Sequence, residues 1–268
     1  RGGSRRSKCP PNLAGSEDKA VNAVNADYEL LQKALAEFGL VFPAENVQQL
    51  YKYLCRLLQA NREMNLTALT SWEDVVSKHL LDSLALLKAP WWKERQADTC
   101  DPLLDVGSGA GFPGLLFALL FPGKSIFLLE ANKKKACFLQ GIKEEENLSS
   151  LSILADRAEN LATQASYREQ FPLVTARAVA RLPELLELTL PFCRCGGFFL
   201  AYKGPQARQE VAEAATACEV LGGKLHTTYS YALPWEKGER TLLFFAKVSP
   251  TPLRYPRRPG IPKKRPLL

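Results

Sequence analysis

The chain has 268 residues, of which 46% are hydrophobic and 24% are charged, a composition typical of globular proteins. No segment is long and apolar enough to span a bilayer. The seven cysteines are odd in number and scattered, and there are only two histidines, which argues against a disulfide framework and against a zinc site. We therefore expect reduced thiols, no bound metal and no contact with a membrane.

The net charge of +7 is concentrated at the two ends of the chain. Residues 1–8 carry four positive charges and residues 249–268 carry six, and neither segment contains an acid, which leaves −3 for residues 9–248. Basic, proline-rich ends suit a polyanionic partner, because phosphate groups attract them. We expect residues 1–20 to be a disordered basic tail and residues 249–268 to be an irregular tail that contacts nucleic acid.

Residues 21–100 are predicted to form a small helical cap. The spacing of apolar residues predicts three helices, over 27–38, 45–61 and 72–87. Ser71, with Asp74 three residues later, suits the beginning of the third helix. That helix carries His79 and Asp82 away from its apolar stripe.

Residues 101–248 change to an alternation of strands and helices. Strands are predicted over 103–106, 125–130, 150–154, 172–175, 197–203, 224–231 and 239–248. Helices are predicted over 114–121, 132–145, 156–165, 182–192 and 205–221. The pattern predicts an α/β fold with a doubly wound, Rossmann-like parallel sheet, closed by a terminal antiparallel strand because no helix separates the last two strands.

The most informative segment is residues 101–114, which read Asp-Pro-Leu-Leu-Asp-Val-Gly-Ser-Gly-Ala-Gly-Phe-Pro-Gly. An apolar strand leads into a turn that contains Gly107, Gly109 and Gly111. Glycines let a backbone approach a ligand closely, and the following helix begins with free N–H groups. The same glycines match the G-x-G-x-x-G spacing of dinucleotide-binding proteins. An NAD-dependent oxidoreductase is therefore one alternative.

Three observations favour S-adenosylmethionine over a dinucleotide. Asp105 stands two residues before the first glycine, where a carboxylate suits the amino group of this methyl donor and repels a pyrophosphate. Pro113 removes one N–H group that a pyrophosphate would use, and no Tyr-x-x-x-Lys pair follows. Glu130, at the end of the second strand, suits either cofactor because a carboxylate there can accept both ribose hydroxyls.

The segment Asp105–Gly114 resembles the fingerprint of the bacterial 16S ribosomal RNA guanine-N7 methyltransferases, formerly called glucose-inhibited division protein B. Further blocks resemble the family in the same order: Asn65–Thr67, His79–Ser83, Arg157–Glu159, Ala176–Ala178, Lys203–Gly204, Tyr255–Gly260 and Lys264–Pro266. Together they span roughly residues 45–266. The chain departs from the family at Ala176, where a serine is usual, and at Glu130, where many members carry aspartate.

The resemblance implies a methyltransferase that uses S-adenosylmethionine and modifies N7 of a guanine in 16S ribosomal RNA of the small subunit. It places Gly107 and Phe112 against the donor, Ala158 and Glu159 along its adenine, and Arg177 at its methionine end or at the substrate. It also implies a monomer in the cytoplasm. The arginine- and serine-rich start keeps the plastid stroma as an alternative compartment.

The residues fit a reaction that needs no base, because guanine N7 has a free lone pair. Thr175-Ala-Arg-Ala178 stands at the end of the fourth strand, where enzymes that methylate amino groups carry an Asn/Asp-Pro-Pro-aromatic tetrad. Cys193 and Cys195 are expected to be buried as small hydrophobic residues rather than to act as nucleophiles. The candidate positioning residues are Arg177, His79 and Lys203. Two further alternatives are a methyltransferase acting on another RNA or a small molecule, and a non-catalytic RNA-binding protein.

Overall fold

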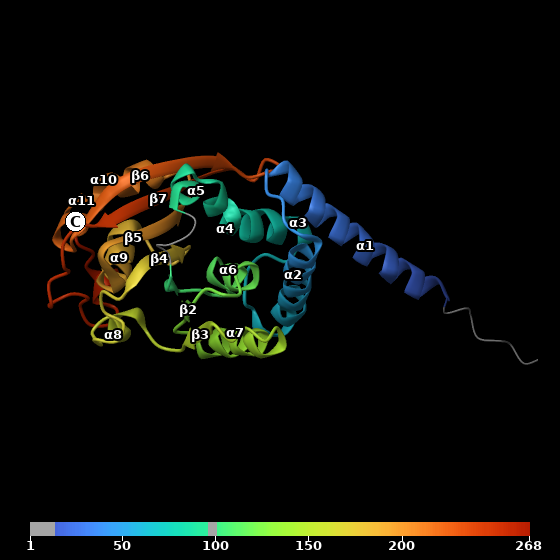
Figure 1. Cartoon of the computed structure of the whole chain (residues 1–268), viewed down its shortest axis with the longest axis horizontal. Helices are drawn as coiled ribbons and strands as arrows, with labels where there is room; N and C mark the ends of the chain where they lie inside the picture. Colours follow the sequence, from blue (N-terminus) through green and yellow to red (C-terminus); the bar gives the residue numbers. More distant parts are fainter. Residues whose placement is uncertain (1–13, 96–100) are drawn as a thin grey trace, which may run out of the picture.

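The computed structural model describes residues 14–95 and 101–268 (Figure 1). In this part of the chain one sheet has the strand order β3-β2-β1-β4-β5-β7-β6. The strands are β1 (Leu103–Val106), β2 (Ile126–Leu129), β3 (Leu151–Leu154), β4 (Phe171–Arg177), β5 (Cys193–Lys203), β6 (Gly223–Ala232) and β7 (Glu239–Lys247). Strands β1 to β5 are parallel, and β7 is antiparallel to both of its neighbours. The predicted doubly wound sheet with a terminal antiparallel strand is confirmed.

The helices that connect these strands are shorter than the sequence predicts. They are α6 (Gly114–Leu120), α7 (Lys133–Glu145), α8 (Ala158–Leu161), α9 (Leu182–Thr189), α10 (Ala207–Glu213) and α11 (Ala215–Val220). The helix predicted over 205–221 is divided at Ala214, whose φ of −93° and ψ of 5° depart from helical values. After α9 the chain continues as the 3₁₀ turn η3 (Leu190–Phe192), because Pro191 has no N–H for an α-helical hydrogen bond.

The cap contains two long helices and one interrupted helical run. The long helices are α1 (Ala14–Glu37) and α2 (Ala44–Met64), and the run is α3 (Trp72–Asp74), the π-helix η1 (Val75–Leu81), α4 (Asp82–Leu84), η2 (Ala85–Lys88) and α5 (Pro90–Arg95). Helix α1 begins inside the segment predicted to be disordered, and residues 1–13 lie outside the described residues. The π-helix was not predicted, because the apolar stripe continues through it.

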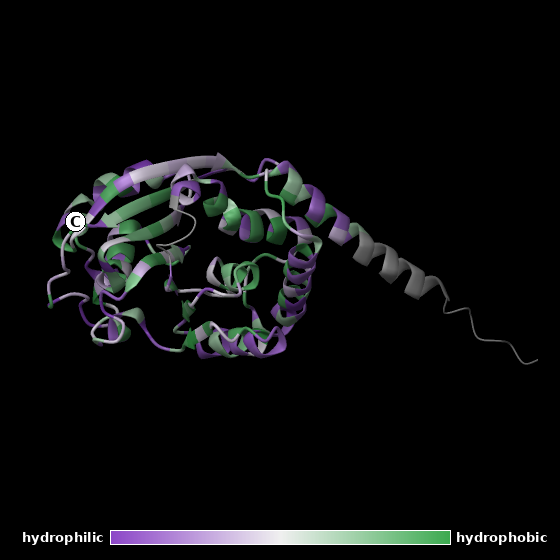
Figure 2. Cartoon of the chain, viewed as in Figure 1, coloured by the Kyte–Doolittle hydropathy of each residue, from purple (hydrophilic) through white to green (hydrophobic). Residues whose placement is uncertain are grey.

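The two faces of the sheet are covered by different elements. Along β1, Leu103 packs in a cluster with the cap and α6, whereas Leu104 packs in a second cluster with α9 and α11. Trp91 of the cap lies with its ring 4.9 Å from that of Phe244 in β7. Figure 2 shows β7 mostly hydrophobic and the neighbouring edge strand β6 paler. The cap therefore shares a hydrophobic core with the sheet and is not a separate folding unit.

The last twenty residues differ most from their prediction. They pack against α8 and α9 and include the short helix α12 (Ile261–Lys264) (Figure 1). Tyr255 and Pro262 are buried, and Arg257 pairs with Glu187 of α9. The sheet domain thus continues past residue 248, because apolar and ionic contacts bind residues 249–264 to it.

Candidate active site

The main cavity lies at the carboxyl ends of the parallel strands, where a doubly wound sheet binds its ligands. It has a volume of about 430 Å³. Its walls come from four parts of the chain: the turn after β1, the ends of β2 to β4, the cap and the C-terminal segment. The predicted site residues that line it are His79, Gly107, Gly109, Phe112, Glu130, Ala158, Glu159 and Arg177.

The turn after β1 forms the floor of this cavity and needs glycine at its first position. Gly107 has a φ of +71°, and a Cβ atom there would lie 2.6 Å from Cγ2 of Val179 in the loop after β4. Gly111 has another role, because its Cβ would meet Leu115 and Leu139, and it does not line the cavity. The predicted ligand contact of Gly111 is therefore replaced by close packing of the turn on α6 and α7.

Asp105 lies behind the cavity, which corrects its predicted contact with the ligand. Its carboxylate is fully buried, and Oδ1 accepts a hydrogen bond of 2.9 Å from Thr175 Oγ1. Oδ2 accepts from the N–H of Gly114 at 3.1 Å. Burial raises the pKa of Asp105 to about 6. Asp105 therefore binds the turn to β4 and to the start of α6, and it does not line the cavity.

Glu130 lies on the cavity wall at the end of β2, as predicted. Its Oε2 accepts from the N–H of Gly109 at 2.8 Å, and its Oε1 accepts from the N–H of Asn132 at 2.7 Å. Each carboxylate oxygen has a second lone pair, so Glu130 can hold the glycine turn and still accept a hydrogen bond from a ligand hydroxyl.

Arg177, the last residue of β4, joins the sheet to the cap. Its Nη1 donates to the carbonyl oxygen of Lys78 at 2.8 Å and to Asp82 Oδ2 at 3.1 Å. Its Nη2 donates to Nδ1 of His79 at 2.8 Å. The π-helix η1 carries Lys78 and His79, and π-helical turns frequently occur at functional sites. Arg177 is thereby fixed in one position on the cavity wall.

His79 is held between Arg177 and Thr67. Because a guanidinium only donates, Nδ1 of His79 accepts, and Nε2 carries the proton that is donated to Thr67 Oγ1 at 2.6 Å. The imidazole stacks on Phe112, with ring centroids 4.7 Å apart. The Arg177 Cζ atom lies 5.3 Å from the same ring. The Phe112 ring therefore packs against both the imidazole of His79 and the guanidinium of Arg177.

The sequence relatives show the family to which the chain belongs. The family model GidB, described as rRNA small subunit methyltransferase G, matches residues 46–237. The chain is 40% identical to the ribosomal RNA small subunit methyltransferase G of Carboxydothermus hydrogenoformans, over 88% of this chain and 98% of the relative. It is 41% identical to that of Geobacillus thermodenitrificans, over 88% of this chain and 97% of the relative. The chain belongs to this family.

As a member of the rRNA small subunit methyltransferase G family, the protein is an S-adenosylmethionine-dependent methyltransferase, as predicted. A solved structure named as an O-methyltransferase from Klebsiella pneumoniae has the same fold, with a TM-score of 0.54 and 16% identity over 84% of this chain and 97% of that chain. The oxidoreductase alternative is set aside. We refer to the main cavity as the donor pocket, because we propose that it binds S-adenosylmethionine.

Lys203 does not line the donor pocket, and its ammonium group is already engaged. Nζ donates to Glu210 Oε2 and to the carbonyl oxygen of Ala180, both at 2.8 Å. Glu210 Oε2 also accepts from the N–H of Leu182. Lys203 therefore fixes the loop between β4 and α9.

The two neighbouring cysteines lie at the start of β5, at the opposite end of the sheet from the donor pocket. Cys193 is buried, and burial raises the pKa of its thiol. Cys195 is exposed, so the prediction that both are buried is wrong for this residue. Neither thiol lies where a nucleophile for methyl transfer would be needed.

Several pocket residues were not singled out by the sequence analysis. They are Thr67, Asp156, Glu184, Gly260 and Lys263. Asp156 follows β3 as Glu130 follows β2, so the same strand-end argument would have found it. Gly260 ends a block that resembles the family, but the sequence gives neither Gly260 nor Lys263 a place in the pocket, because they reach it only through the fold of the C-terminal segment.

A second cavity of about 280 Å³ adjoins the donor pocket. The two cavities share Arg177 and Ala178 as common walls. Ala178 has a φ of +55°, and such strained residues cluster at functional sites. Four cationic side chains and one acidic side chain, that of Asp82, line the second cavity. The cationic residues are Lys78, Arg177, Lys203 and Arg240.

Among the described residues, no cluster of histidine, cysteine, aspartate and glutamate has the arrangement of a metal site. None of the helices over residues 14–95 and 101–268 combines the length and the apolarity that a membrane span requires.

Replacing Gly107 by alanine is expected to lower the affinity for S-adenosylmethionine at least about tenfold, a loss of about 1.4 kcal/mol of binding free energy. The new methyl group needs the space of Val179 Cγ2, and the φ of +71° disfavours any side chain. Isothermal titration calorimetry measures the affinity. The double variant Gly107→Ala/Val179→Ala should recover part of it, and equal affinities of Gly107→Ala and wild type would show that the turn does not form the floor of the pocket.

His79 is expected to make the protein less stable as the pH falls. Burial and the neighbouring Arg177 lower its pKa from 6.5 to about 3. Between these values the unfolded chain binds a proton that the folded protein does not, so lowering the pH from 7 to 5 should cost about 2 kcal/mol of unfolding free energy. Asp105, whose pKa is raised, works in the opposite direction in both proteins, so urea unfolding at both pH values should show wild type losing about 2 kcal/mol more than His79→Gln on acidification. An equal pH dependence in both proteins would contradict a buried, neutral imidazole.

Proposed function

We propose that the protein transfers a methyl group from S-adenosylmethionine to N7 of a guanine in 16S ribosomal RNA of the small subunit. Two findings support the proposal: membership of the rRNA small subunit methyltransferase G family, and a donor pocket that shares the wall Arg177 with a cationic cavity. The relatives named above are ribosomal RNA small subunit methyltransferases, and they are similar over nearly their whole length.

The residues of the donor pocket fit this donor. Gly107 and Gly109 line the pocket without a side chain, and Glu130 offers acceptors for ribose hydroxyls. Ala158 and Glu159 would line the adenine, and Arg177 would face the methionine carboxylate or the substrate. The donor, when bound, supplies an electrophilic methyl group on a sulfonium centre.

The second cavity is suited to the nucleotide that accepts the methyl group. Lys78 and Arg240 can attract phosphate groups, and Arg177 stands between the two cavities. Guanine N7 attacks through its own lone pair, so the protein needs to align the base rather than to remove a proton. The fixed position of Arg177 and the stack of His79 on Phe112 supply rigid walls for that alignment.

We further propose that the protein works as a monomer where ribosomes are assembled. For a bacterial member of the family that place is the cytoplasm, and the plastid stroma is the alternative. The proposed compartment follows from the ribosomal substrate.

The proposed substrate is tested with a donor labelled in its methyl group. Small subunits that lack the modification, naked 16S ribosomal RNA and free guanosine are each incubated with protein and donor. We expect label in one or both ribosomal RNA substrates and none in guanosine, because the cationic cavity recognises a nucleotide within a polyanion. Label in guanosine alone, or in none of the three, would contradict the proposal.

A further inference from the structure

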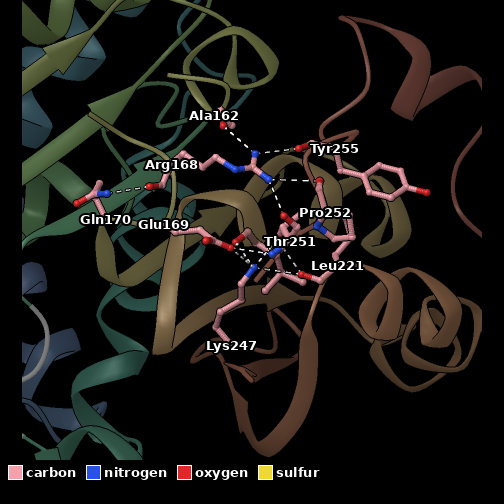
Figure 3. Close-up of polar contacts among 10 residues, drawn as sticks. Ala162, Arg168, Glu169, Gln170, Leu221, Lys247, Thr251, Pro252 and Tyr255 are labelled. Atoms are coloured by element: carbon pink, nitrogen blue, oxygen red, sulfur yellow. Dashed lines mark hydrogen bonds and ion pairs between the residues drawn. The ribbon is translucent and has the colours of Figure 1, made fainter. Parts of the chain in front are cut away.

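The C-terminal segment 249–264, which we call the strap, is tied to the sheet domain by Arg168 (Figure 3). Its guanidinium donates four hydrogen bonds to carbonyl oxygens: Ala162 at 3.1 Å, Thr251 at 2.7 Å, Pro252 at 3.3 Å and Tyr255 at 2.9 Å. Three of these acceptors belong to the strap. One side chain therefore fixes the path of the strap beside the loop that follows α8.

A buried lysine ties the beginning of the strap to the end of β7. Nζ of Lys247 donates to the carbonyl oxygens of Leu190 and Leu221, each at 3.2 Å, and to Thr251 Oγ1. Glu169 neutralises it, with Oε1 3.2 Å from Nζ, and the same oxygen accepts from the N–H of Thr251 at 2.7 Å (Figure 3). The ammonium group of Lys247 and the carboxylate of Glu169 are thus paired and hydrogen-bonded. Buried charges require such partners, because an unpaired charge away from water is unfavourable.

The middle of the strap is tied to α9 by an ion pair. Glu187 is fully buried, and Arg257 binds it through the backbone N–H at 2.8 Å, Nε at 2.9 Å and Nη2 at 2.6 Å. A bidentate guanidinium–carboxylate pair has a defined geometry as well as charge complementarity. The strap is therefore positioned before it reaches the donor pocket.

Beyond these anchors the strap enters the wall of the donor pocket. The N–H of Gly260 donates to Glu159 Oε1 at 3.1 Å, and both Gly260 and Lys263 line the pocket. Three acids meet here from α8 and α9, namely Glu159, Glu184 and Glu187. The strap places a donor or a cation near each acid: the N–H of Gly260 at Glu159, Arg257 at Glu187 and Lys263 near Glu184.

We propose that residues 259–264 form the wall of the donor pocket on the side of the adenine and hold Glu159 in position for the donor. The inference rests on the proposed function, in that the nucleoside of S-adenosylmethionine occupies this side of the pocket. The strap thus contributes to donor binding rather than serving only as a basic tail for RNA. Removing this wall opens the pocket to water beside α8 and α9.

Hydrogen exchange of the complete chain tests the wall without any substitution. Amide exchange is measured by mass spectrometry with and without saturating S-adenosylmethionine. We expect exchange to slow together in residues 107–111 and in residues 259–264. Slowing in the glycine turn alone would overturn the proposed wall. No slowing in either segment, with no donor binding by calorimetry, would instead contradict the proposed function.

A chain that stops after Arg258 tests the contribution to affinity. It keeps the anchors at Arg168, Lys247 and Arg257 but lacks Gly260 and Lys263. We expect the dissociation constant for S-adenosylmethionine to rise at least about tenfold, since a charge-assisted hydrogen bond and a pocket wall are lost. The full-length control Arg265→Gln, which removes an exposed charge outside the proposed wall, should bind the donor as wild type does. Unchanged affinity in the shortened chain would overturn the proposal.

Discussion

Replacing Arg177 by alanine is expected to lower the rate of methyl transfer at least about a hundredfold, the size of effect seen when one positioned donor group is removed from an active site. Arg177 is the common wall of the two cavities and holds His79 and Asp82. Without it, the aligning wall is lost, and the buried Asp82 keeps the hydroxyl of Tyr231 at 2.6 Å and the more distant Nε of Arg240 at 4.0 Å. Single-turnover assays with labelled donor and small subunits measure the rate.

Two further variants make the Arg177 prediction specific. Arg177→Lys keeps the charge but lacks the planar group that binds three acceptors, so it should also be slow. Arg181→Ala removes a guanidinium four residues away whose side chain is 71% exposed and pairs with Glu213, and it should transfer methyl groups at nearly the wild-type rate. Wild-type rates in Arg177→Ala would show that the aligning groups lie elsewhere.

Replacing Arg257 by leucine is expected to destabilise the protein by about 3 kcal/mol, because it leaves the buried carboxylate of Glu187 without a cation to pair with. The double variant Glu187→Leu/Arg257→Leu removes both charges and should recover most of this loss. Urea unfolding followed by tryptophan fluorescence measures the unfolding free energy.

The exposed neighbour Arg258 provides the matched control for this ion pair. Arg258→Leu removes the same group one residue along the strap and should change the unfolding free energy by less than about 0.5 kcal/mol. A single Arg257→Leu variant as stable as the double variant would mean that the strap is not bound to α9 through this pair.

The features that were predicted correctly depend on residues close together in the sequence. Alternating strands and helices, the glycine turn and the acid that ends β2 each have a local pattern. No local sequence pattern predicts the direction in which the Asp105 side chain points. Its partner Thr175 is seventy residues away, so the same spacing fits a carboxylate that contacts a ligand and one that supports the turn.

The features that were missed depend on contacts between distant segments. The bond between His79 and Arg177 joins residues 98 positions apart, and the pair of Glu187 and Arg257 joins residues 70 positions apart. The basic, proline-rich composition of residues 249–268 indicates a tail when considered alone. It becomes a pocket wall because the acids of α8 and α9 and the carbonyl acceptors around Arg168 bind it.

We infer that this donor pocket serves methyl transfer to a ring nitrogen that needs no deprotonation. The most direct test is to digest small-subunit RNA to nucleosides after reaction with donor carrying a labelled methyl group, and to identify the labelled nucleoside by mass spectrometry. We predict that the label appears in 7-methylguanosine from 16S ribosomal RNA. Label in a methylated cytidine, in an adenosine or on an exocyclic amino group would contradict the account.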